Sequence, residues 1–210
     1  MIRKINIGIA EDHDMVRQGF VRALRDEKKI QICFEARNGT ELFNSLHSTA
    51  IDVLLLDFRM PEMDGRNAIE KLKHEFPQLK IIVISGYADE DNILEFVKQG
   101  ADSFLPKESD ISTLVEAILT VFQDNFYFNT KILELLERTG STPPKTSKKL
   151  TDREKGILKL LCKGRTSEQI SKELGIKEIT IAGHKHRILQ KTLTKSVEEL
   201  RDYAQKHRYL

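Results

Sequence analysis

The chain has 210 residues, of which 40% are hydrophobic and 31% are charged, a composition typical of folded globular proteins and not of disordered or fibrous ones. No apolar run approaches the roughly 18 residues that a membrane span needs, and the N-terminus lacks the order of a secretory signal peptide. We therefore expect a cytoplasmic protein with no membrane partner. Cys33 and Cys162 each lie in an apolar run, which favours buried free thiols over a disulfide.

Charge is divided unequally along the chain. Residues 1–130 hold 15 Lys and Arg against 22 Asp and Glu, whereas residues 131–210 hold 19 against 10. The first part therefore has a net charge of −7 and the second +9, within a total of +2. A basic half is a candidate for binding a polyanion, although two ordinary solvated surfaces explain the charges equally well. Two adjacent prolines in residues 139–147 indicate a linker between the halves.

Five short β-rich runs alternate with helical stretches in the first part. Helix signals lie between them: Asn38 and Glu41 have capping-box spacing, Gly100 ends one helix, and Ser109 starts the next. Five β-α units predict an α/β domain with a doubly wound, five-stranded parallel sheet. The order of the strands is not readable from the pattern. The predicted strands are residues 4–10, 30–36, 53–57, 80–85 and 103–106.

Polar residues lie at the carboxyl ends of these strands or directly after them, which is where open parallel sheets bind their ligands. An acidic residue at one strand end often only caps a helix, but polar groups at successive strand ends favour a shared site. Carboxylates packed together need a cation among them, and Mg²⁺ prefers hard oxygen ligands of this kind. The polar residues are Glu11, Asp12, Asp57, Ser85 and Lys107.

These side chains can accept a phosphoryl group. A carboxylate beside Mg²⁺, such as Asp57, can attack phosphorus as a nucleophile and form an aspartyl phosphate. Lys107 as a point charge and Ser85 as a hydrogen-bond donor can hold the remaining phosphoryl oxygens. A Mg²⁺-dependent phosphohydrolase built on Asp57 is an alternative, but the basic C-terminal part has no role in such an enzyme.

Four motifs in this part, over about residues 4–122, resemble the receiver domain of two-component response regulators. The resemblance implies a CheY-like receiver fold and phosphorylation by a sensor histidine kinase. Glu11 departs from the family, in which many members have Asp at this position. The motifs are Ile-Ala-Glu11-Asp12-His13, Leu-Leu-Leu-Asp57-Phe58-Arg59-Met60-Pro61-Glu62-Met63-Asp64-Gly65, Val-Ile-Ser85-Gly86-Tyr87 and Phe104-Leu105-Pro106-Lys107.

The resemblance also implies a role for each site residue. Asp57 is implied as the phosphorylation site, and Phe104 as an aromatic rotamer switch coupled to Ser85. Lys107 and Ser85 are implied to bind the phosphoryl group. The implied Mg²⁺ ligands are Glu11, Asp12, Asp57 and the backbone carbonyl of Arg59.

An all-α unit of four helices is predicted after the linker. Capping-box spacing recurs at three helix starts, and Gly175-Ile176-Lys177 is the short turn that a helix-turn-helix needs. The predicted helices are residues 152–163, 167–174, 178–191 and 197–206. The capping pairs are Thr151 with Glu154, Thr166 with Gln169, and Ser196 with Glu199.

The third of these helices has the composition of a DNA recognition helix, because its polar residues supply donors for phosphates and base edges. A solvated helix face is the alternative. Residues 149–207 resemble the LuxR-type DNA-binding domain of the NarL/FixJ class, through Leu150–Glu154, Gly164–Thr166 and Ile170–Ile176. The residues expected to contact DNA are Thr180, Ala182, Gly183, His184, Lys185, His186, Arg187 and Lys191.

The sequence as a whole predicts a response-regulator transcription factor and not an enzyme. Expected partners are a sensor histidine kinase and double-stranded DNA, with Mg²⁺ as cofactor and a homodimer as the active form. A regulator that acts only by protein–protein contact is an alternative. The predicted domains are a receiver at residues 1–124, a connecting helix and linker at 125–148, and the helix-turn-helix domain at 149–210.

Overall fold

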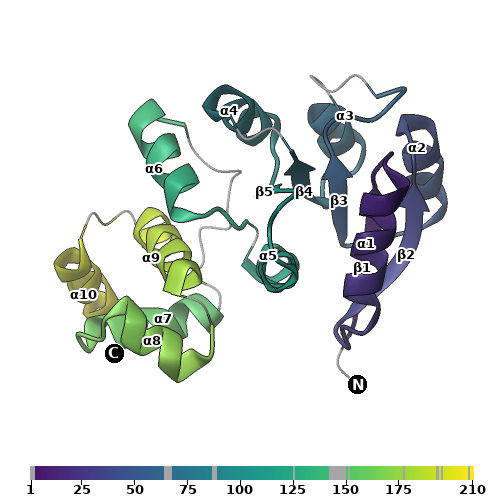
Figure 1. Ribbon diagram of the computed structural model, residues 1–210. Coiled ribbons are helices and arrows are strands. Elements are labelled where there is room, and N and C mark those ends of the chain that lie inside the picture. The colour runs from purple at the N-terminus through teal and green to yellow at the C-terminus, as the bar shows by residue number, and fades with distance from the viewer. Residues whose placement is uncertain are drawn as a thin grey trace. The chain divides into compact units, whose positions relative to one another are not determined.

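The computed structural model describes residues 3–63, 68–86, 89–124, 126–141, 150, 152–176, 178–192, 194, 196–207 and 209–210. The described residues up to Tyr127 belong to one compact unit, and those from Phe128 to Gly140 and from Leu150 onward form a second. Figure 1 shows their helices and strands. Within these ranges, none of the helices combines the length and the apolar composition that a membrane crossing needs.

A five-stranded parallel sheet forms the centre of the first unit, in the order β2-β1-β3-β4-β5. This confirms the predicted doubly wound fold and adds the strand order. The winding direction reverses between β1 and β3, so the carboxyl ends of these two strands border the crevice where such sheets bind ligands. The strands are β1 (Ile5–Ala10), β2 (Ile30–Ala36), β3 (Val53–Asp57), β4 (Lys80–Ser85) and β5 (Ser103–Pro106).

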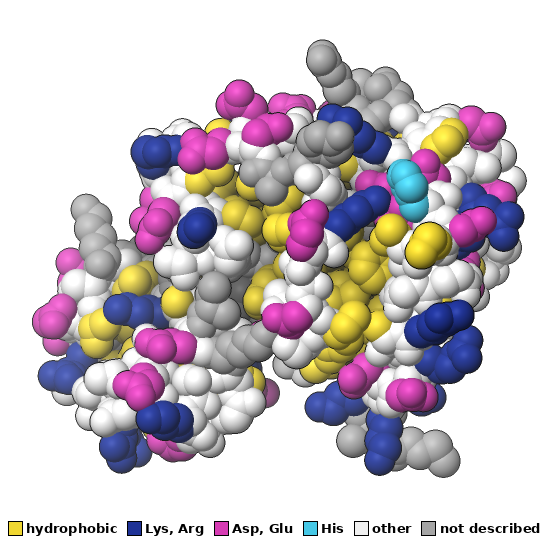
Figure 2. Space-filling model, in the orientation of Figure 1, with side chains coloured by type: hydrophobic (Ala, Val, Ile, Leu, Met, Phe, Trp, Pro, Cys, Tyr) yellow, Lys and Arg dark blue, Asp and Glu magenta, His cyan; other side chains and the backbone are white. Residues whose placement is uncertain are grey.

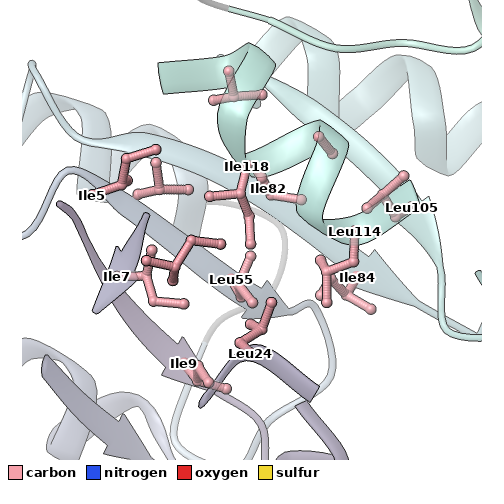
Figure 3. Packing of buried hydrophobic residues seen from close by; sticks show 14 of the residues in the cluster. Ile5, Ile7, Ile9, Leu24, Leu55, Ile82, Ile84, Leu105, Leu114 and Ile118 are labelled. Carbon is pink, nitrogen blue, oxygen red and sulfur yellow. The ribbon is translucent and has the colours of Figure 1, made fainter. Parts of the chain in front are cut away.

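Helices cover both faces of the sheet, which explains why the strands are nearly continuous apolar runs. Leu24 of α1 and Leu114 and Ile118 of α5 pack with Ile82 and Ile84 of β4 in one buried cluster (Figure 3). The other three helices lie on the opposite face (Figure 1). The helices are α1 (Asp14–Arg25), α2 (Gly39–Ser48), α3 (Ala68–Glu75), α4 (Glu90–Gln99) and α5 (Ile111–Asp124).

On the face of the first unit seen in Figure 2, hydrophobic side chains gather between α1 and α5. Phe20 of α1 and Val115, Leu119 and Phe122 of α5 are only partly buried, and they pack against the cluster of Figure 3. The core therefore reaches the surface between these two helices.

Local signals set several helix ends of this unit. Asn38 caps α2 by accepting a backbone N–H, and Gly100 ends α4 with a left-handed φ of 102°, as predicted. The predicted start of α5 at Ser109 is wrong. The carboxylate of Asp110 accepts the N–H of Thr113 at 2.7 Å, so Asp110 is the residue that caps the helix.

The second unit is all-α, and four of its five described helices, α7 to α10, agree with the four predicted ones to within a residue. Thr166 and Gln169 form the predicted reciprocal capping box, and Ser196 accepts the N–H of Glu199 at 3.2 Å. Thr151 and most of the predicted linker lie outside the described residues. The helices are α6 (Thr130–Thr139), α7 (Asp152–Cys162), α8 (Ser167–Leu174), α9 (Glu178–Thr192) and α10 (Val197–Lys206).

Candidate phosphoryl-acceptor site and DNA-binding surface

The carboxyl ends of β1 and β3 and the residue that follows β5 bring two carboxylates and one ammonium together. Asp57, the last residue of β3, is 4% exposed. The Nζ atom of Lys107, just after β5, lies 2.8 Å from Oδ2 of Asp57 and 2.8 Å from Oε2 of Glu11, which follows β1. Lys107 therefore bridges both carboxylates, although these residues are 50 and 96 positions from it in the chain.

Burial and charge set the protonation of this group. Burial raises the pKa of Glu11, and the negative charge of Asp57 raises it further, against the hydrogen bond from Lys107. Burial alone lowers the pKa of Lys107, but its hydrogen bonds to Asp57 and Glu11 outweigh that effect and raise the pKa. The lysine is therefore charged at neutral pH and compensates the buried carboxylates.

Four side chains offer ligand atoms that all lie within 4.8 Å of one another: Glu11, Asp12, His13 and Asp57. Three of them are carboxylates, the hard oxygen donors that Mg²⁺ prefers, so the residues present fit such an ion. Nδ1 of His13 lies 2.7 Å from Oδ1 of Asp12, and the negative charge of Asp12 raises the pKa of this histidine. Sequence reasoning had not assigned His13 to the cluster, although it directly follows the acidic pair.

The other predicted residues of this site lie at the same edge of the sheet. Ser85 ends β4 and is 2% exposed, and its carbonyl accepts the backbone N–H of Lys107 at 3.0 Å. The backbone N–H of Arg59 donates to Oδ1 of Asp57 at 3.2 Å. Phe104 is buried in β5.

Three aromatic rings are in contact beside the candidate acceptor, one from the residue after β3, one from α4 and one from β5. The ring of Phe58, the residue after Asp57, contacts that of Phe96 edge to face with centroids 4.4 Å apart. Phe96 in turn stacks on Phe104 with centroids 5.9 Å apart. The position of Phe58 beside Asp57 was a signal in the sequence, but the place of Phe96 depends on how α4 packs and gave none.

Helix α9, which contains the predicted DNA-contacting residues, is partly covered within the second unit. Thr180 is 4% exposed and His184 is 2% exposed, and Gly183 is also buried. Helix α6 packs against α9. Ala182 and Lys185 keep part of their surface, so the predicted residues do not all face solvent in this structure.

Lys191, near the end of α9, points into the second unit. Its Nζ lies 2.7 Å from Oε2 of Glu154 in α7, and the two side chains are 1% and 0% exposed. The ion pair joins α7 to α9. The side chains of His186 and Arg187 lie outside the described part of the structure.

Two families match the chain, one for each half. Residues 7–119 match the response regulator receiver domain. Residues 148–204 match the luxR family of bacterial regulatory proteins. The two matches cover the candidate acceptor site and the candidate DNA-binding helices respectively.

Similar proteins share this organisation over their whole length. The oxygen regulatory protein NreC of Staphylococcus carnosus is 31% identical over 98% of this chain and 99% of its own. The RcsB response regulator of Salmonella typhimurium has a TM-score of 0.60 at 23% identity, over 98% of this chain and 100% of its own. A structure of two RcsB dimers bound to two parallel DNAs has a TM-score of 0.57 at 24% identity, over 97% and 98% of the two chains.

Proposed function

Because this chain belongs to the response regulators that join a receiver domain to a LuxR-type DNA-binding domain, a family of transcription regulators and not of enzymes, we propose that Asp57 is its phosphorylation site. The observation that carries the proposal is the position of Lys107, whose ammonium lies 2.8 Å from Asp57 and from Glu11. In the proposed transfer, the bond from phosphorus to a histidine nitrogen of a sensor kinase breaks and a bond to a carboxylate oxygen of Asp57 forms.

Mg²⁺ is the proposed cofactor of this transfer. Glu11, Asp12, Asp57 and the backbone carbonyl of Arg59 would hold it, and the clustered carboxylates support this assignment. When bound, the ion supplies neutralisation of the charge on the transferring group. Lys107 supplies a second positive charge beside Asp57 and reduces the repulsion between the phosphoryl oxygens and the carboxylates.

Ser85 and Phe104 are proposed to relay phosphorylation to the surface of the domain. Ser85 binds a phosphoryl oxygen through its hydroxyl, and Phe104 changes rotamer with it. The stack of Phe104 on Phe96 supports a path from this switch to α4. Added negative charge at one site is enough to bias an element that has two arrangements.

The proposed output is binding of double-stranded DNA by the C-terminal unit as a homodimer, in the cytoplasm. The proposed DNA contacts are the residues predicted on α9 other than Lys191, whose ammonium is buried against Glu154. The proposed domains are the receiver at residues 1–124, the connection at residues 125–148 and the DNA-binding domain at residues 149–210. The family match supports DNA binding. Two-fold dimers read pairs of half-sites.

Labelling with acetyl phosphate tests the proposed acceptor. The wild-type protein with Mg²⁺ should incorporate one phosphoryl group, and Asp57→Asn should incorporate none. Asp52→Asn, a change of the same kind at the other end of β3, is the matched control and should be labelled like the wild type. Labelling that persists in Asp57→Asn contradicts the assignment.

A salt series of DNA-binding measurements separates this function from action by protein contact alone. For a domain that contacts DNA phosphates, the logarithm of the binding constant falls linearly with the logarithm of the salt concentration. Phosphorylated wild-type protein should show such a slope on duplex DNA, and absence of binding at low salt would favour the protein-contact alternative.

A further inference from the structure

Arg17 is a buried cation next to the candidate phosphorylation site, and sequence reasoning gave it no role. Its side chain is 2% exposed and is among the largest fully buried side chains of the described residues. It lies in the first turn of α1, and α1 follows directly from the loop that holds Glu11 and Asp12. A guanidinium stays charged at any relevant pH, so its burial requires several partners.

The partners of Arg17 tie that loop to two other elements. Nη1 donates to the main-chain carbonyl of Glu11 at 2.8 Å. Nε donates to Oε2 of Glu35, near the end of β2, at 3.3 Å, and Nη2 donates to the carboxylate of Asp14. The planar guanidinium thus holds a carbonyl and two carboxylates in fixed directions, which one ammonium cannot do.

The main chain of Glu11 is held from both sides. Its N–H donates to the carbonyl of Ala36 at 3.0 Å, and its carbonyl accepts from Arg17. The side chain of Glu11, which is 1% exposed, then has little freedom, and Asp12 follows on the same short loop. These two residues supply two of the three clustered carboxylates.

We propose that Arg17 is a positioning residue, which fixes the loop so that the carboxylates of Glu11 and Asp12 face a divalent cation together with Asp57. The proposal rests on the metal site of the proposed function. Groups that orient metal ligands typically change metal affinity about 10- to 100-fold when they are removed. Arg17 acts through the main chain of a ligand and does not touch the ion.

The loss of charge and the loss of loop geometry in Arg17→Met should change the affinity for a cation in opposite directions. Loss of a positive charge makes the region more negative and, by Coulomb's law alone, strengthens the binding of a cation. Loss of the fixed loop geometry weakens it. We expect the dissociation constant of Mn²⁺, measured by the electron paramagnetic resonance signal of free Mn²⁺ with Mg²⁺ as competitor, to rise about tenfold. An unchanged or lower dissociation constant overturns the proposal.

Lys73→Met is the matched control for a loss of stability. Lys73 is also a largely buried cation, and it donates to Oδ2 of Asp102 at 2.5 Å and to the carbonyl of Leu79 at 2.8 Å. Asp102 precedes β5, so this pair lies at the opposite end of the strands from Asp57. Lys73→Met should lower the unfolding temperature and leave the dissociation constant of Mn²⁺ within about twofold of the wild type.

Two further measurements keep the test decisive. Arg17→Lys retains the charge but not the three fixed contacts, so it should also bind Mn²⁺ more weakly than the wild type. If Arg17→Met does not fold, Arg17→Lys tests the positioning role in its place. Equal affinity in Arg17→Lys and wild type then rejects the positioning role. If the wild-type protein itself binds no Mn²⁺, the proposed metal site is the hypothesis that fails.

Discussion

The ammonium of Lys191 lies 2.7 Å from the carboxylate of Glu154, and both side chains are almost completely buried. Removing one partner of a buried ion pair takes away compensation of the remaining buried charge, which costs about 3–5 kcal/mol. We expect Lys191→Met to lower the free energy of unfolding of the C-terminal unit by about this amount in urea titrations. The double change Lys191→Met with Glu154→Leu should recover most of it.

The salt dependence of DNA binding distinguishes a structural lysine, such as Lys191, from a lysine that contacts DNA. Lys185, on the same helix, keeps part of its surface exposed. If it neutralises one phosphate, Lys185→Met reduces the slope of log affinity against log salt by about 0.9. The variant with both Lys191→Met and Glu154→Leu should keep the wild-type slope of log affinity against log salt. A reduced slope in that variant would assign Lys191 to the DNA interface, as the sequence pattern predicted.

Features set by local sequence patterns could be predicted, whereas contacts between distant elements could not. Asp57 and Lys107 could be predicted to lie together because Asp57 ends β3 and Lys107 directly follows β5. Parallel strands place their carboxyl ends at one edge of a sheet whatever their order. The pair of Glu154 with Lys191 was missed because it joins two helices whose packing no local pattern specifies. Arg17 was missed because a charged residue is not expected in a core, although it has the helical spacing of the buried residues Val21 and Leu24. Its partner Glu35 lies on β2, and no local pattern joins the two.

At the proposed site, Lys107 and a divalent cation would neutralise the same carboxylates, so each should reduce the effect of the other. Lys107→Met removes the ammonium that lies between Asp57 and Glu11, and the protein should be less stable without metal. Saturating Mg²⁺ should then raise the unfolding temperature of this variant more than that of the wild type. Equal or smaller shifts in differential scanning calorimetry contradict the shared role. Lys98→Met, at an exposed position of α4, should behave as the wild type.

The stability of the receiver unit should depend on pH through Lys73. Burial lowers the pKa of this ammonium below its usual value of about 10.5, although the negative charge of Asp102 opposes the effect. Between the lowered folded pKa and about 10.5, the unfolded chain binds more protons, so stability rises with pH through that window. The unfolding free energy of the wild type minus that of Lys73→Met, from urea titrations in this range, should increase with pH. A difference that falls or stays constant rules out the effect.

Helix α6 should limit DNA binding by the unphosphorylated protein, because it packs against α9, where Thr180 and His184 are buried. Leu136 of α6 is 1% exposed. Leu136→Gln should weaken the packing of α6 and raise the affinity for duplex DNA about tenfold, or about 1.4 kcal/mol, in fluorescence anisotropy. Glu134→Gln, on the exposed side of the same helix, is the matched control and should bind as the wild type. If Leu136→Gln folds and binds DNA no better than this control, α6 does not restrict α9.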